Sequence, residues 1–431
     1  MTTLLQRAVL SGCILGAAVH ASAAEEGLPE LTARGQALLF GTHLGVEQGS
    51  FLNPGNRLAG IPDAEGSAEL RLDLMARWQP CRAQARLRGR ADRVLDATPP
   101  PDERDSGDAF LNAGSLRCRI GQRTTVLVGR EVEQWGSAFF LSPSNPFFFD
   151  TGRTDPVREL YGKDIWQLSA YLDPTTTLSL TRNYRAGPRE PERTGFSETT
   201  ALRLDWTGQA ASGGLVFARR DDGIERLGAY GTWTYSSAWL FYTDLALARG
   251  HAGWFARPGG EALSWHFERS KRDRDQAFYS VLMGAGYTFE SGWTATAEWL
   301  TGNEGYDSGE RSAYDAAVEE ASRAFAAGGA DSGEAAGVLV AGLSPGLPYL
   351  ARNTLFLQLA RNEWNDKADV ALRWTQAFGS GSGASLSFSA TYYLTGHLQA
   401  FAIGSRNVGG VRTDFGRLVR DSLSLGFRYY F

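Results

Sequence analysis

The chain ends in the stretch Asp421-Ser-Leu-Ser-Leu-Gly-Phe-Arg-Tyr-Tyr-Phe431. Every second side chain in it is large and apolar, namely Leu423, Leu425, Phe427, Tyr429 and Phe431. The alternate side chains are small or polar, namely Ser422, Ser424, Gly426, Arg428 and Tyr430. Successive side chains of a strand point to opposite faces, so this period predicts a strand with one apolar face and one hydrophilic face.

The same alternation recurs along the chain and is clearest in residues 68–79 and 81–94. In the second segment small apolar residues alternate with Arg82, Gln84, Arg86, Arg88 and Arg90. A dry protein core cannot hold such a face without a large desolvation cost, so this face requires water. A barrel with lipid outside and water inside satisfies both faces.

Eighteen segments follow this pattern, and sixteen is the alternative if the two weakest, 213–221 and 397–405, are not strands. The predicted strands are 34–47, 68–79, 81–94, 109–120, 123–133, 163–172, 175–185, 198–207, 213–221, 225–236, 238–249, 277–289, 292–302, 353–363, 367–378, 384–395, 397–405 and 421–431. Tight turns alternate with long linkers, as short periplasmic turns alternate with long extracellular loops in such barrels. The predicted fold is therefore all-β, a transmembrane antiparallel up-and-down β-barrel.

The N-terminus predicts a secretory signal peptide over residues 1–23, with Arg7, an apolar run from Ala8 to Val19 and a small-residue site at 21–23. The apolar run is too short for a membrane-spanning helix. Lipidation at Cys13 is the alternative, but almost no hydrophobic sequence precedes that residue. We therefore expect export through the Sec pathway to the Gram-negative outer membrane, with a single barrel domain over 24–431.

Composition limits the other classes of function. The net charge of -5 argues against a nucleic-acid partner for the chain as a whole. The five histidines are scattered, and no cysteine–histidine cluster has metal-ligand spacing, so we expect neither a metal nor a cofactor. An outer-membrane enzyme would need a nucleophile near His43, His251 or His266, and no nucleophile motif stands beside them. We expect a protein that is not an enzyme.

Arginines concentrate on the hydrophilic faces of the early strands and the last one, where we expect them to line the pore: Arg71, Arg77, Arg82, Arg86, Arg88, Arg90, Arg117, Arg119 and Arg428. An arginine-lined pore favours anions, because the guanidinium cannot lose its charge. The alternative is a neutralised network, with Glu69 and Asp73 pairing some of these arginines. Arginines outnumber these two acids, so the sequence favours an uncompensated positive patch.

The linker 134–162 is rich in proline and aromatic residues, and we expect it to fold inward as a constriction loop. The residues expected to anchor it or to meet the solute are Trp135, Asn145, Arg153, Asp155 and Arg158. The alternative is an outer loop packed over the rim.

A resemblance appears in the same region. The run Gly129-Arg130, Trp135-Gly136 and Pro143-x-Asn145 resembles a GR…WG…NP segment of Gram-negative porin-like families, which include alginate-export-type barrels. This resemblance implies an outer-membrane channel for anionic, sugar-like or other small polar solutes. Polysaccharide-export barrels are similar in having an arginine-rich lumen.

Two further features concern the loops and the cysteines. The linker 303–352 contains helix-forming sequence at 313–327 and then an apolar stretch, which predicts a lid or plug-like loop; a partner-binding loop is the alternative. Cys81 and Cys118 lie at the periplasmic ends of adjacent predicted strands and face outward. If the register places them opposite each other, a disulfide can join them; otherwise they are two small lipid-facing residues.

The leading hypothesis is a monomeric or trimeric channel for polar, anionic or sugar-like solutes. The alternatives are an exporter of an anionic polysaccharide and, from other classes, an enzyme or a structural barrel. Expected partners are outer-membrane lipids, lipopolysaccharide and the outer-membrane assembly machinery. Phe427, Tyr429 and Phe431 resemble the terminal signal that this machinery reads.

Overall fold

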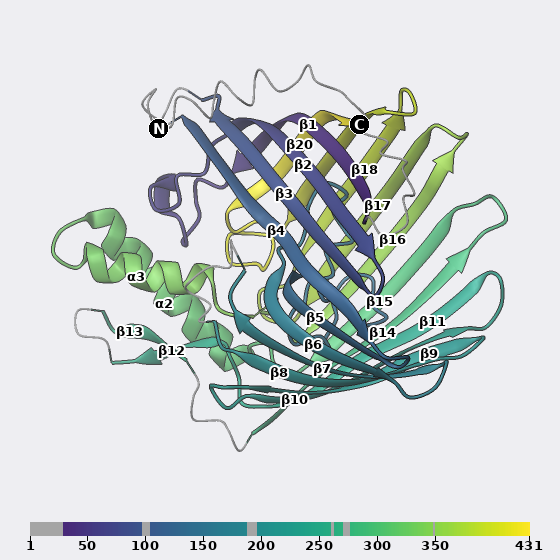
Figure 1. Cartoon of the computed structure of the whole chain (residues 1–431). Helices are drawn as coiled ribbons and strands as arrows, with labels where there is room; N and C mark the ends of the chain where they lie inside the picture. Colours follow the sequence, from purple (N-terminus) through teal and green to yellow (C-terminus); the bar gives the residue numbers. More distant parts are fainter. Residues whose placement is uncertain (1–28, 97–103, 188–195, 260–262, 270–275, 348–349) are drawn as a thin grey trace.

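The computed structural model describes residues 29–96, 104–187, 196–259, 263–269, 276–347 and 350–431. Within them, 18 strands form one antiparallel sheet that closes on itself, because β1 pairs with both β2 and β20 (Figure 1). The strands are β1 (Glu30–Val46), β2 (Ala64–Trp78), β3 (Cys81–Val94), β4 (Asp105–Ile120), β5 (Thr124–Glu131), β6 (Lys163–Tyr171), β7 (Thr176–Arg185), β8 (Thr199–Thr207), β9 (Ala211–Arg220), β10 (Glu225–Thr234), β11 (Trp239–Arg249), β14 (Ala277–Thr288), β15 (Thr294–Gly302), β16 (Asn353–Trp364), β17 (Ala368–Phe378), β18 (Gly383–Tyr393), β19 (Leu398–Val408) and β20 (Val419–Tyr430).

The strand prediction is confirmed: each of the 18 strands overlaps one predicted segment. The two weakest segments are β9 and β19, so the alternative of sixteen strands is wrong. The largest boundary error is at the N-terminal ends of β1, β2 and β4, which start four residues before the predicted positions. The predicted signal peptide, residues 1–23, lies outside the described residues.

Every connection at one end of the barrel is a tight turn, and this end, here called the turn end, also holds the start of β1 and the end of β20. Two short connections, 221–224 and 379–382, lie at the other end. The opposite loop end carries the long connections, including 132–162, 250–276 and 303–352. Neighbouring strands are consecutive in the chain, so the barrel is up-and-down. No helix among the described residues is both long and apolar enough to span a membrane.

The outer surface of the barrel is apolar. On β20, Leu425 and Phe427 are 54% and 53% exposed, and leucines on other strands, such as Leu74 and Leu215, are similarly uncovered. Large apolar side chains that point away from the barrel without cover need lipid around them. The alternation read from the closing strand therefore has the predicted sense, with the apolar face outward and Arg428 inward.

A small cap stands at the loop end, built from α2 (Ser308–Ala327), α3 (Ser332–Leu343), the hairpin of β12 (Trp254–Pro258) and β13 (Trp265–Arg269), and η2 (Pro54–Asn56) (Figure 1). These segments come from three different connections and enclose their own apolar core, which includes Leu52, Phe255, Tyr314 and Leu339. The cap is therefore a packed unit.

Sequence alone predicted one helix in this region, and the structure has two. The first begins earlier than predicted, because Asp307 and Glu310 form reciprocal side chain–backbone hydrogen bonds at its start. Most of the apolar stretch that follows belongs to α3. Burial raises the pKa of the Tyr314 phenol, which stays protonated and donates to the carbonyl of Gly342 at 2.9 Å.

Candidate functional site

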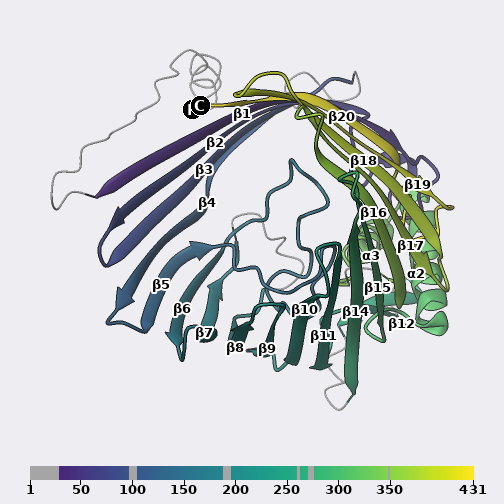
Figure 2. The same cartoon turned by 90° about the vertical axis from the view of Figure 1, so that its right-hand side faces the viewer.

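The connection 132–162 lies inside the barrel, where Figure 2 shows it as a trace surrounded by strands. Its backbone contacts opposite parts of the wall. The carbonyl of Pro143 accepts from Arg226 of β10 at 2.8 Å, and the carbonyl of Pro156 accepts from Arg428 of β20 at 3.0 Å. The loop thus crosses the lumen from one side to the other. We refer to it below as the inner loop.

Two buried acids on the wall hold the first half of the inner loop. Asp244 of β11 is 0% exposed and accepts from the Ser142 hydroxyl and the Ser144 N–H, both at 2.7 Å. Glu298 of β15 accepts from the N–H groups of Phe139 and Phe140 at 2.5 and 3.0 Å. Sequence reasoning missed both residues. Each is a single carboxylate on the inward face of a strand with few other polar side chains, and this sequence pattern could have identified it.

Aromatic contacts support the same half of the loop. The ring of Trp135 meets that of Phe147 edge to face at 5.4 Å, and the guanidinium of Arg203 lies 4.5 Å from the Trp135 ring. Asn145 is buried, and its side-chain oxygen accepts from the backbone N–H groups of Phe147 and Phe148 at 2.9 and 3.0 Å. Asn145 therefore shapes the turn of the loop, and it also lines a cavity of about 270 Å³.

The charged residues of the second half are engaged within the loop. Arg158 pairs with Asp150 at 2.6 Å. The carboxylate of Asp155 accepts from the N–H groups of residues 157 and 158. Arg153 donates to the carbonyl of Ala138 at 3.3 Å and lines a cavity of about 370 Å³ near the turn end. All three residues line cavities of the lumen while stabilising the loop.

The arginines nearer the loop end are neutralised. Arg71 pairs with Glu69 at 2.6 Å, and Arg90 pairs with Asp92 at 2.6 Å. Arg88 is 7% exposed and pairs with two acids, Asp73 at 2.8 Å and Glu159 of the inner loop at 2.5 Å. This half of the arginine array is the stiffening network that sequence reasoning held as its alternative. Glu159 could not be assigned to it, because the path of the loop was unknown.

The arginines nearer the turn end are different. Within the described part of the chain, Arg82, Arg86, Arg117 and Arg119 form no ion pair and no side-chain hydrogen bond. Asp73 stands directly opposite Arg86 in the sheet but is paired with Arg88. The array therefore divides along the barrel axis into a compensated half and an uncompensated half.

The two remaining arginines differ from both halves in their partners. Arg77, at the turn end of β2, is half-exposed and has an acid, Glu30, at 4.0 Å. Arg428 donates to Tyr430 at 3.2 Å as well as to the inner loop. Arg428 therefore serves as a second attachment point of the loop.

Two cavities adjoin the arginine wall. One of about 310 Å³ lies between the inner loop and the wall and is lined by Arg71, Arg88 and Arg90 together with Asp155 and Glu159. Another, of about 380 Å³, lies toward the turn end and is lined by Arg34, Gln36, Asp73 and again Arg71. Arg71 thus lines both cavities. They lie on the side of the lumen that the first half of the inner loop does not occupy.

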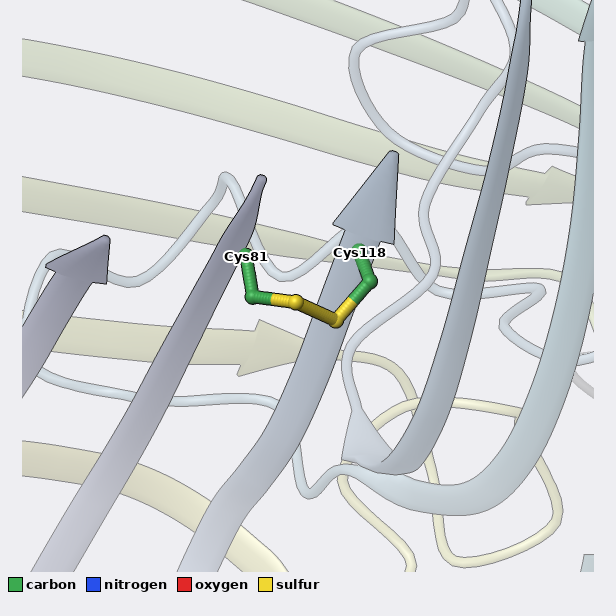
Figure 3. The surroundings of a disulfide bond; sticks show 2 residues. All are labelled: Cys81 and Cys118. Atoms are coloured by element: carbon green, nitrogen blue, oxygen red, sulfur yellow. A yellow bond between two sulfur atoms is a disulfide. The ribbon is translucent and has the colours of Figure 1, made fainter. Parts of the chain in front are cut away.

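A disulfide joins Cys81 of β3 to Cys118 of β4 at the turn end (Figure 3). The two residues are direct partners in the sheet register, with Cα atoms 4.1 Å apart. Among the described residues, no group of three or more His, Cys, Asp or Glu side chains could hold a metal ion.

No family model matches the sequence, and no curated protein matches it. Solved structures from Pseudomonas aeruginosa do match. OccK9 (OpdG) has a TM-score of 0.55 at 11% identity, covering 94% of this chain and 98% of that one. OccK11 (OpdR) has a TM-score of 0.54 at 12% identity, covering 92% and 95%. OpdK, solved with vanillate, has a TM-score of 0.53 at 12% identity, covering 93% and 98%.

These similar structures are outer-membrane porins of the OccK/OprD group. The likeness extends over nearly the whole length of both chains, although sequence identity is low. The chain therefore has the porin fold, as a closed 18-stranded barrel whose apolar outer surface is suited to a membrane.

Proposed function

We propose that this protein is a passive channel for small anionic solutes. The observation that carries the proposal is the uncompensated half of the arginine array: Arg82, Arg86, Arg117 and Arg119 face the lumen without an acidic partner among the described residues. Fixed guanidinium groups raise the local concentration of anions in a narrow aqueous path and present donors suited to carboxylates and phosphates. The net charge of -5 belongs to the whole chain and does not oppose this local field.

The inner loop supports small solutes over polymers. It crosses the lumen and is tied to the wall by buried hydrogen bonds of Asp244 and Glu298. An anionic polysaccharide, the substrate of the alternative exporter, would have to thread past this loop as a continuous chain. OpdK, which has the same fold, was solved with vanillate, a small aromatic carboxylate. That solute class fits both the arginines and the constriction.

Reversal potentials in planar bilayers under a KCl gradient test the proposal. We expect anion preference for the wild-type protein. Replacing Arg82, Arg86 and Arg117 together by glutamine should shift the reversal potential toward the cation side. The matched control is Arg219→Gln, which removes a charge that is 67% exposed at the loop end of β9. Cation preference in the wild-type channel, or a triple variant identical to wild type, would contradict the proposal.

A further inference from the structure

Three arginines occupy one row across three neighbouring strands at the turn end. Arg77 of β2 is the direct register partner of Arg82 of β3, and Arg82 is the direct partner of Arg117 of β4. Neighbouring strands lie about 4.8 Å apart, so one anion of carboxylate or phosphate size can contact two such guanidinium groups together. The row is therefore a candidate anion site at the end of the lumen.

The Arg82–Arg117 pair has no compensation among the described residues. Neither guanidinium pairs with an acid, and the Nε of Arg117 is buried without a hydrogen-bond partner. Like charges directly opposite each other on adjacent strands are destabilising. An unpartnered buried donor adds a further cost, which a bound anion would remove. The Arg82–Arg117 pair is thus unfavourable for folding and suited to binding an anion.

No turn joins the two strands that carry Arg82 and Arg117 at this end of the sheet. A tight turn joins β2 to β3 at Gln79 and Pro80, and another joins β4 to β5 at residues 121–123. β3 and β4 are connected only through the long linker at the opposite end of the barrel. The turn-end edge between them therefore lacks a turn to hold it, and this is the edge on which Arg82 faces Arg117.

The disulfide lies on this edge, one residue away from the arginine pair. Cys81 and Cys118 are register partners, as are Arg82 and Arg117 beside them. Side chains alternate between faces, so the disulfide lies on the outer face and the arginines on the inner one. The sulfur atoms leave the lumen unobstructed while linking the two backbones that carry the guanidinium groups.

We propose that the Cys81–Cys118 disulfide is a positioning element that holds Arg82 and Arg117 opposed, as a two-guanidinium site for a carboxylate or phosphate at the turn end of the lumen. The inference rests on the proposed function, because the site is part of an anion path. Under this proposal, anion selectivity also depends on the Cys81–Cys118 disulfide, which lies outside the anion path.

The test is a cycle of variants in planar bilayers with KCl gradients. The first variant is Cys81→Ser with Cys118→Ser, the second is Arg117→Gln, and the third combines them. Arg219→Gln, in native and Ser/Ser backgrounds, is the control. Should the Ser/Ser protein fail to fold, the folded wild-type protein, reduced in detergent by a phosphine and checked by maleimide labelling of two thiols, takes its place.

We expect loss of the disulfide to lower the anion-to-cation permeability ratio about twofold, as expected when a fixed charge of a pore is no longer held in place. Arg117→Gln should then have a smaller effect in the Ser/Ser background than in the native one. A Ser/Ser protein that unfolds at a lower urea concentration yet keeps the wild-type anion-to-cation permeability ratio would overturn the inference. The disulfide would then stabilise the barrel without positioning the arginines. A wild-type channel without anion preference would instead contradict the proposed function itself.

Discussion

The carboxylate of Asp244, on the barrel wall, accepts a hydrogen bond at 2.7 Å from the backbone N–H of Ser144, which lies 100 residues earlier in the chain. The same carboxylate accepts from the Ser142 hydroxyl, and it is completely buried. A buried carboxylate is tolerated when donors surround it, and here the donors belong to the inner loop. The position of the loop and the burial of this acid therefore depend on each other.

Replacing Asp244 by alanine should release the first half of the inner loop. The Ser144 N–H and the Ser142 hydroxyl would lose their acceptor, at a cost of about 1–3 kcal/mol for each buried group left unsatisfied. We expect larger and noisier single-channel conductance than in wild type. Asp369→Ala is the control, because the hydrogen bonds of Asp369 within the described residues join it to strand residues near the turn end. Equal conductance changes in both variants would rule out a specific role for Asp244.

The compensated half of the arginine array should govern stability. Arg88→Ala would leave Glu159 and Asp73 without their shared partner. The guanidinium is buried but both acids are partly exposed, so we expect a loss of about 1.5–3 kcal/mol, the range for hydrogen bonds to charged groups. Urea unfolding in detergent measures the change. Arg182→Ala is the comparison, because its partners Glu198 and Asp221 are exposed and exposed pairs contribute little. If the urea midpoint of Arg88→Ala is no lower than that of Arg182→Ala, the compensated half does not govern stability.

The cap should unfold separately from the barrel. Arg311 and Asp414 pair at 2.5 Å and are each only 2% exposed. Asp414→Ala would leave the buried guanidinium with the partly exposed Asp315 as its remaining acidic partner among the described residues, beside the carbonyl of Arg412. We expect a loss of about 3 kcal/mol in cap packing, with faster proteolysis confined to residues 303–352. Asp331→Ala is the control within the cap, because that side chain makes no capping hydrogen bond. Faster cleavage of both variants would argue against this ion pair as the cause.

The terminal residue should matter for barrel closure. Phe431 exchanges two backbone hydrogen bonds with Gly35, at 2.8 and 3.0 Å, and its ring covers the position where a Gly35 side chain would stand. Deleting Phe431 should lower the fraction of protein that reaches the heat-modifiable folded form. Gly35→Val should do the same by displacing the ring. Phe431→Tyr, which keeps an aromatic terminus, is the control and should assemble like wild type.

Strand number, strand order and the assignment of faces could be predicted from the sequence, because each depends on local alternation. Each of the residues 423, 425 and 427 is apolar for the same local reason, namely contact with lipid. Cys81 and Cys118 were also predicted to share a face and an end of the barrel. Whether they were direct partners depended on the register of the two strands, which a short hairpin turn would fix and the longer β3–β4 connection does not.

The division of the arginines could not be predicted in this way. Arg88 and Arg82 stand on the same face of one strand, six residues apart, and look equivalent in the sequence. They differ because Glu159 reaches Arg88 from the inner loop, 71 residues away in sequence, whereas no acid among the described residues reaches Arg82. The sequence by itself determined a closed amphipathic barrel, since period-two alternation is a local property. Only the tertiary structure decided which charges remain uncompensated, because that depends on where a folded loop delivers its carboxylates.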